Sequence, residues 1–259
     1  MTQDDVRSLI KIPTVTIGFW IIKILATTLG ETGGDSVSMS LADSIGMTHD
    51  WGYMVGTALF LPLLALLVWV QIRAKSYHPF LYWATIIAST TAGTTMADYA
   101  TRSMGIGYTG GSALLLSLVL LSLYVWYRTL GSISVETVHE PKAELFYWIT
   151  ITISQTLGTA LGDWAADTGG LGYIGAAAIF AAALGLIAIL YWKTAVSHVY
   201  LFWAAFILTR PLGAAVGDFL DKPLEKGGLD FSRPLASLVL AVAIVALIVF
   251  WPKQNQSVQ

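Results

Sequence analysis

The chain has 259 residues, of which 56% are hydrophobic and 12% charged, and its formal net charge is −2. This composition is too apolar for a soluble domain and indicates a polytopic membrane protein. The chain contains no cysteine, which excludes disulfides, thiolate metal ligands and a thiol nucleophile.

The apolar stretches predict membrane-spanning helices, each of which needs about 20 residues to cross the hydrocarbon core. Eight stretches have roughly this length, at residues 12–30, 52–71, 79–97, 107–127, 145–162, 171–192, 198–217 and 234–251. They leave little room for a soluble domain. We therefore expect a single all-α transmembrane domain over residues 1–259.

An internal repeat organises the chain. Its first copy, FWIIKILATTLGETGGDS, covers residues 19–36, and the pattern returns without a gap at 82–99, 147–164 and 202–219. Each copy has a Trp, a Gly ten residues later and an Asp five residues after the Gly; the tryptophans are Trp20, Trp83, Trp148 and Trp203. Four copies are a strong repeat signal and predict repeats over about 12–77, 78–141, 142–197 and 198–252.

Each repeat contains two predicted spans, and this even number gives successive repeats the same orientation. Their pseudo-symmetry axis is then expected along the membrane normal, as in parallel-repeat carriers. The four first helices could surround a centre, with the plainer second helices outside.

Lys and Arg in the loops predict the orientation of the chain. Eight of them fall on the side of the termini and four on the other side, so the N- and C-termini are expected in the cytoplasm. The opposite side carries 11 of the 16 acidic residues. This outer mouth should therefore attract cations and repel anions.

The first helix of each repeat carries a small, polar face. Thr27, Gly30, Glu31, Gly34 and Asp35 are spaced at i, i+3, i+4, i+7 and i+8, which places them on one side of a helix. The matching polar residues are Thr90, Thr94 and Asp98, then Gln155, Thr159 and Asp163, then Arg210 and Asp218. This face is where a substrate or proton site is expected.

Two basic residues, Lys23 and Arg210, lie inside predicted spans. Charges there are costly in lipid, so both should face the protein interior with acidic partners on neighbouring helices. Glu31 has no acidic equivalent in the other repeats and is the strongest single candidate, with Lys23 as its counterpart. The alternative is a set of interior salt bridges that only fixes the packing of the repeats.

The remaining residues of the stripe have two interpretations each. The Gly and Thr positions suit close helix packing, and a filter lined by Thr oxygens is the alternative. The four repeat tryptophans suit core or interfacial anchors, and an aromatic cage for an organic cation is the alternative. The repeat aspartates could bind a cation or proton, or cap the turn that follows each helix.

The motifs FYWITITISQTLGTALGDW and LFWAAFILTRPLGAAVGDF, with SVET before the third repeat, resemble the bacterial "uncharacterised membrane-anchored proteins". That family is built of four tandem two-span repeats of unknown function. The resemblance covers nearly the whole chain and implies eight spans in a bacterial inner membrane. It implies no activity.

The expected function follows from the charged residues inside the spans. We expect a transporter of a metal or other small cation, and exchange of this cation for protons is one mode of coupling. A non-transporting scaffold or sensor and a passive channel are the alternatives. The sequence has no HExxH motif, nucleophile elbow or phosphate loop, so no enzyme is expected. No cofactor and no nucleic-acid partner are expected; the expected partners are membrane lipid and the transported cation or proton.

Overall fold

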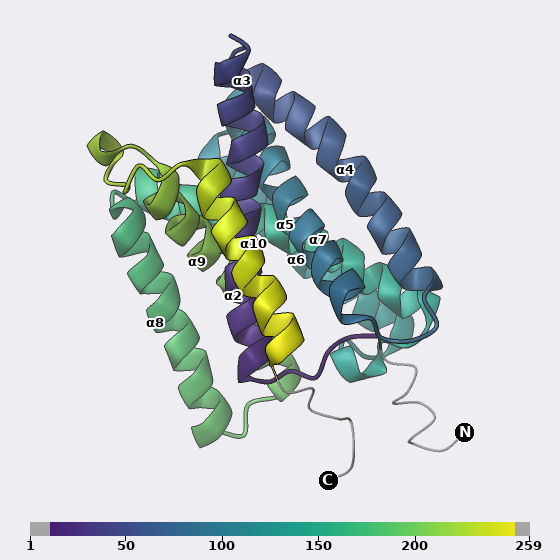
Figure 1. Ribbon diagram of the computed structural model, residues 1–259. Coiled ribbons are helices and arrows are strands. Elements are labelled where there is room, and N and C mark those ends of the chain that lie inside the picture. The colour runs from purple at the N-terminus through teal and green to yellow at the C-terminus, as the bar shows by residue number, and fades with distance from the viewer. Residues whose placement is uncertain (1–10, 252–259) are drawn as a thin grey trace.

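The computed structural model describes residues 11–251, and its secondary structure is helical throughout that range (Figure 1). Eight of the described helices have 18 to 25 residues: α2 (Ile17–Asp35), α4 (His49–Arg73), α5 (Pro79–Asp98), α6 (Gly107–Leu130), α7 (Pro141–Asp163), α8 (Gly172–Lys193), α9 (His198–Asp221) and α10 (Arg233–Phe250). The short helix α3 (Leu41–Ser44) lies in the connection between α2 and α4. The all-helical class expected from the sequence is confirmed.

Five of these helices are long and apolar enough to cross a membrane, namely α4, α6, α8, α9 and α10. The other three, α2, α5 and α7, bury many hydroxyl and charged side chains instead of presenting a uniformly apolar surface. The prediction of membrane-spanning helices is thus confirmed for five of the eight stretches by length and composition.

A closed ring of four helices forms the centre of the fold. Helix α2 packs against α5 and α9, and α7 also packs against α5 and α9. Each of the other long helices lies outside this ring, against the first helix of the following repeat: α4 on α5, α6 on α7, α8 on α9, and α10 on α2 (Figure 1). The last contact closes the cycle between the fourth repeat and the first.

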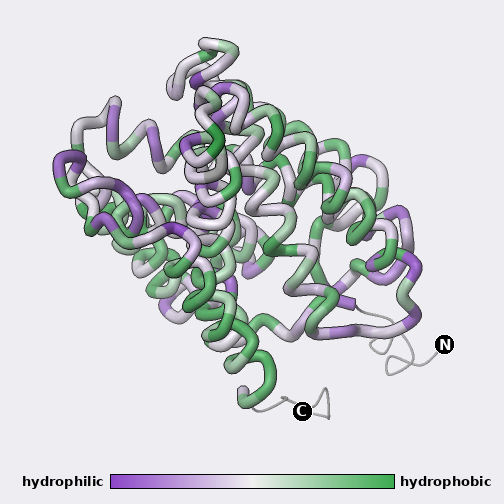
Figure 2. The backbone as a smooth tube through the Cα atoms, turned by 45° about the horizontal axis from the view of Figure 1, so that its top comes forward, coloured by the Kyte–Doolittle hydropathy of each residue, from purple (hydrophilic) through white to green (hydrophobic). Residues whose placement is uncertain are grey.

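The outer helices expose apolar side chains. Leu59, Leu120, Leu186 and Leu238, one from each outer helix, are each more than half exposed. In Figure 2 hydrophobic residues dominate the helix that ends at the C-terminus, whereas hydrophilic residues gather in the connecting loops. Exposed apolar surface on this scale suits contact with lipid rather than water.

The repeat glycines allow the ring helices to approach closely. A Cβ atom added at any of the four would lie 3.0 Å or less from a heavy atom of the next ring helix. The pairs are Gly30 with Thr90, Gly93 with Gln155, Gly158 with Arg210, and Gly213 with Thr27. In each pair the partner is the residue three positions before the next repeat's glycine. The small residue therefore sets the same helix–helix register four times around the ring.

An aromatic layer closes the N-terminal end of the ring. The aromatic residue that precedes each repeat Trp packs on the Trp of the next repeat, with ring centroids 5.5 to 6.2 Å apart. The pairs are Phe19–Trp83, Tyr82–Trp148, Tyr147–Trp203 and Phe202–Trp20. The hydroxyl oxygens of Tyr82 and Tyr147 share a hydrogen bond of 2.7 Å. All four tryptophans therefore belong to one packed aromatic cluster, in which Trp20 is only partly buried.

Candidate functional site

The four repeat aspartates come together at the end of the ring opposite the aromatic layer. Asp35, Asp98, Asp163 and Asp218 are each at most 3% exposed. Asp35, Asp98 and Asp163 are the last α-helical residues of α2, α5 and α7, each of which continues into a five-residue π-helical turn, and Asp218 lies in the last turn of α9. Near the C-terminal end of a helix the dipole opposes a negative charge. The charges of these aspartates therefore require basic partners, and the structure supplies two.

Arg102 links the aspartates of α5 and α7. Its Nε lies 3.0 Å from Asp98 Oδ1, and its Nη2 donates to Asp163 Oδ2 at 3.2 Å. Its Nη1 also donates to the Tyr53 hydroxyl at 3.3 Å. Burial opposes the charge of Arg102, but the two carboxylates outweigh it and raise the pKa of the guanidinium well above its usual range.

Lys222 links the aspartates of α9 and α2. Its ammonium forms ion pairs with Asp35 and with Asp218, the latter at 3.0 Å, and lies 4.0 Å from Asp221. The Met39 Sδ atom completes its surroundings at 3.8 Å. Burial opposes the charge here too, but the carboxylates, Asp218 first, raise the pKa of Lys222 well above its usual range.

The residues four positions after the repeat aspartates form the floor of a pocket. They are Met39, Arg102, Asp167 and Lys222, and the first three lie in π-helical turns (Ser36–Ser40, Tyr99–Ser103 and Trp164–Thr168). Such turns widen a helix and frequently occur at functional sites. We call this pocket, of about 660 Å³, the vestibule; Asp43, His49, Tyr173, Pro223, Lys226 and Arg233 also line it.

The ion-paired network beneath the vestibule carries an excess of negative charge. This network contains five acids, the four repeat aspartates and Asp221, and the three bases that pair with them, Arg102, Lys222 and Arg233. Five negative charges against three positive ones leave a formal charge of −2. A cation is therefore favoured at this end of the ring.

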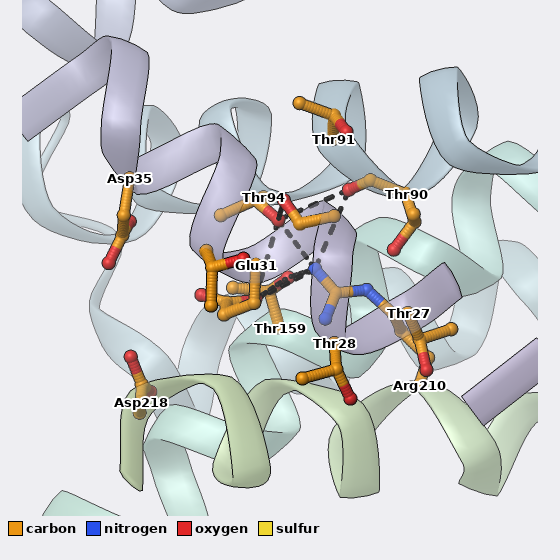
Figure 3. A network of polar contacts seen from close by, with 12 residues as sticks. Thr27, Thr28, Glu31, Asp35, Thr90, Thr91, Thr94, Thr159, Arg210 and Asp218 are labelled. Atoms are coloured by element: carbon orange, nitrogen blue, oxygen red, sulfur yellow. Dashed lines mark hydrogen bonds and ion pairs between the residues drawn. The ribbon is translucent and has the colours of Figure 1, made fainter. Parts of the chain in front are cut away.

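A second charged layer lies deeper in the ring, where Arg210 of α9 pairs with Glu31 of α2 (Figure 3). Its Nη2 lies 2.9 Å from Glu31 Oε2 and also donates to the Thr94 and Thr159 hydroxyls. Glu31, Thr94 and Thr159 occupy the same position in their repeats. Arg210 thus reaches across the axis to the other three ring helices.

Several buried polar atoms near Arg210 have no hydrogen-bond partner within residues 11–251. They are Arg210 Nε and Nη1, Thr90 Oγ1, and both side-chain polar atoms of Gln155. Thr27, Thr90, Gln155 and Arg210 are equivalent in the four repeats, and all four are fully buried or nearly so. An unpaired buried polar group costs about 1–3 kcal/mol. This layer is therefore suited to take up water or a polar ligand.

The acidic partner that we expected for Lys23 on a neighbouring helix is not found among residues 11–251, and Lys23 does not contact Glu31 either. It is fully buried, its Nζ donates to Thr209 Oγ1 at 3.3 Å, and it lies 4.0 Å from the centre of the Phe206 ring. Glu31 lies eight positions after Lys23 on the same helix, a rise of about 12 Å that a lysine side chain cannot cover. Within the described chain, no carboxylate lies in ion-pair contact with Lys23.

The structure brings Glu31, Asp35, Asp98, Asp163, Asp218 and Arg210 to the inside of one ring, with the Thr and Gln side chains of the stripe beside them. Arg102 and Lys222 were missed because the sequence placed both in outer loops. A signal was available, since each follows a repeat aspartate by four residues and shares its helix face.

Three of the carboxylates lie close enough together to provide oxygen ligands for one cation. One oxygen each from Glu31, Asp35 and Asp218 lies within 4.8 Å of the other two. In Figure 3 the carboxylates of Asp35 and Asp218 point toward one another from α2 and α9, with Glu31 beside them. Carboxylate oxygens in this arrangement are ligands that hard divalent cations accept.

The family comparison identifies the repeat. The family described as "Repeat of Unknown Function (DUF347)" matches four segments, at residues 18–77, 81–132, 146–197 and 201–257. No curated protein and no solved structure matches the chain. The four matches together cover well over half of the sequence, so the chain belongs to the DUF347 repeat family, whose function is unknown.

Proposed function

We propose that the protein is an integral membrane transporter of a small cation, such as a metal ion, held by carboxylates inside the ring. The observation that carries this proposal is the convergence of five carboxylates from four helices at almost fully buried positions: Glu31, Asp35, Asp98, Asp163 and Asp218. Acidic residues inside membrane bundles mark ion and proton pathways. No catalytic step is proposed.

The proposed topology has eight spans in a bacterial inner membrane. Helices α2, α5 and α7 count as spans because outer helices cover them, so that their polar stripes face the ring and not lipid. The excess of loop Lys and Arg on the side of the aromatic layer supports cytoplasmic N- and C-termini. The vestibule then opens to the outer side of the membrane.

A carrier fits this axis better than an open channel. A cation that entered from the vestibule would meet the buried guanidinium of Arg210, then the buried Lys23, and finally the aromatic layer. Passage therefore requires a rearrangement of the ring. Carboxylates that release a cation can take up protons, so the chemistry of the site favours proton exchange as the coupling mode.

A structural scaffold is the second candidate, because each buried carboxylate of the axis already has a basic partner. Glu31 pairs with Arg210, Arg102 spans two aspartates, and Lys222 spans two more. Buried ion pairs of this kind can specify packing without any transport role. A scaffold of this type would fold normally and move no ion.

Flux measurements separate these candidates. Purified protein in liposomes is expected to move a cation, such as Mn²⁺, Na⁺ or K⁺, at a rate that depends on the pH gradient. Glu31→Gln is expected to lower this flux at least about tenfold, because it removes the central carboxylate charge. Glu136→Gln is the matched control, since Glu136 is exposed in the 3-10 turn Val135–Thr137 between α6 and α7, outside the ring and the vestibule. Wild-type protein that folds but moves no cation would favour the scaffold.

A further inference from the structure

The four repeat aspartates, which we call the aspartate ring, are bridged by two basic residues, and these two residues differ in kind. Arg102 presents a rigid planar fork to two aspartates and lies 5.7 Å from the centre of the Tyr108 ring. Lys222 presents a compact ammonium on a flexible stem. An arginine fork is pre-organised for carboxylates, whereas a lysine ammonium is strongly hydrated and makes no fixed fork. The Lys222 half of the ring is therefore the half that can open.

We propose that Lys222 is a resident competitor in a divalent-cation site formed by Glu31, Asp35 and Asp218, and that a bound cation displaces its ammonium into the vestibule. This inference rests on the proposed function and assigns the substrate class and its control to one half of the ring. The Arg102 half, with Asp98 and Asp163, then has a structural role.

The contacts of Lys222 resemble the coordination shell of a metal ion. Its ammonium lies among carboxylates of Asp35, Asp218 and Asp221, with the Met39 thioether at 3.8 Å. Asp35 Oδ1 provides an independent indication. It is fully buried and accepts no hydrogen bond from any described residue, although Asp35 Oδ2 holds Lys222. This free oxygen is available as a ligand.

The side chain of Lys222 can leave without unfolding α9. Lys222 follows the last residue of the helix, and its side chain lines the vestibule together with Met39. Its backbone is fixed on both sides, because its N–H donates to the Asp218 carbonyl and its own carbonyl accepts from Asp230, each at 2.9 Å. Movement can therefore be confined to the flexible stem.

The charge balance favours a divalent ion over a monovalent one. The network of the four repeat aspartates, Asp221 and their three basic partners has a formal charge of −2, which becomes −3 when the Lys222 ammonium moves away from it. A monovalent ion would only restore −2, whereas a divalent ion brings this network to −1. The oxygen ligands suit Mg²⁺, Ca²⁺ and Mn²⁺, and the Met39 thioether adds a softer donor that favours Mn²⁺ among them.

Binding of Mn²⁺ to the purified full-length protein, measured by electron paramagnetic resonance, tests the proposal. Lys222→Met is expected to bind Mn²⁺ at least about tenfold more tightly than the wild type, a change of about 1.4 kcal/mol, because the competing charge is gone. Lys222→Arg is expected to bind more weakly, because an arginine fork holds its carboxylates more firmly. Adding Asp35→Asn to Lys222→Met should abolish the gain.

Arg102→Met is the matched control and should gain clearly less Mn²⁺ affinity than Lys222→Met, because Arg102 pairs with Asp98 and Asp163 and not with the proposed ligands. Equal or weaker binding by Lys222→Met, in protein that stays monodisperse, would overturn the inference even where the wild type transports a cation. If Lys222→Met does not fold, equal binding by Lys222→Arg and the wild type would overturn it instead. Wild-type protein that moves Na⁺ or K⁺ while neither it nor Lys222→Met binds Mn²⁺ leaves the transporter standing and overturns the divalent site. Absence of any cation flux contradicts the transporter itself.

Discussion

Replacing Arg210 with methionine is expected to destabilise the protein by about 3–5 kcal/mol, because it leaves the Glu31 carboxylate buried without its partner. Arg210 is fully buried, and its Nη2 group contacts Glu31, Thr94 and Thr159 on the three other ring helices. The loss should appear as a lower apparent melting temperature in detergent and a smaller fraction of monodisperse protein.

The double variant Glu31→Gln/Arg210→Met separates charge burial from packing. Removing both charges should recover at least about half of the loss, because the cost of the single variant comes mainly from the uncompensated carboxylate. Arg128→Met is the control: Arg128 is exposed on an outer helix, so its loss should change stability by no more than about 0.5 kcal/mol. A double variant as unstable as Arg210→Met would show that Arg210 acts through its packing against Gly158 and not through its charge.

The ring could be predicted from the sequence to a useful degree. The repeat register identifies Gly30, Gly93, Gly158 and Gly213 as equivalent, and the structure places each against the residue three positions before the next repeat's glycine. The repeat period and the composition predict this packing, because a small, polar helix face in an otherwise apolar protein packs against other helices and not against lipid.

The pairing of charges within the ring could not be predicted. Lys23 and Arg210 both lie on polar faces, yet among the described residues only Arg210 contacts a carboxylate, whereas Lys23 donates to Thr209. The position of a side-chain head group depends on the rotation and offset of neighbouring helices, which a single repeat does not encode. For the same reason the sequence predicted Arg102 and Lys222 as loop residues, although each bridges two of the repeat aspartates.

Gly213→Ala is expected to destabilise the protein by about 1–3 kcal/mol through overpacking of α9 against α2. The added Cβ would collide with the Thr27 side chain and lie 2.9 Å from the Thr27 backbone carbon. A rotamer change could move the Thr27 hydroxyl, but the Thr27 Cβ and backbone carbon can move only through a shift of the whole helix. Such a shift would alter the register that aligns Glu31 with Arg210, so ion flux should fall together with the melting temperature.

Two alanine substitutions on other glycines show whether close approach is the cause. Gly185 on α8 has open space around it, and Gly33 on α2 has only the Ser237 hydroxyl at 4.0 Å. Alanine at either position should be neutral or stabilising by up to about 1 kcal/mol, because alanine has the higher helix propensity. Gly30→Ala is intermediate, since its nearest neighbours are all atoms of the Thr90 side chain, and Thr90→Ala should restore part of its loss. Equal melting temperatures for Gly213→Ala and Gly185→Ala would mean that the ring tolerates a wider helix spacing. The alignment of the buried charges would then not depend on the glycines.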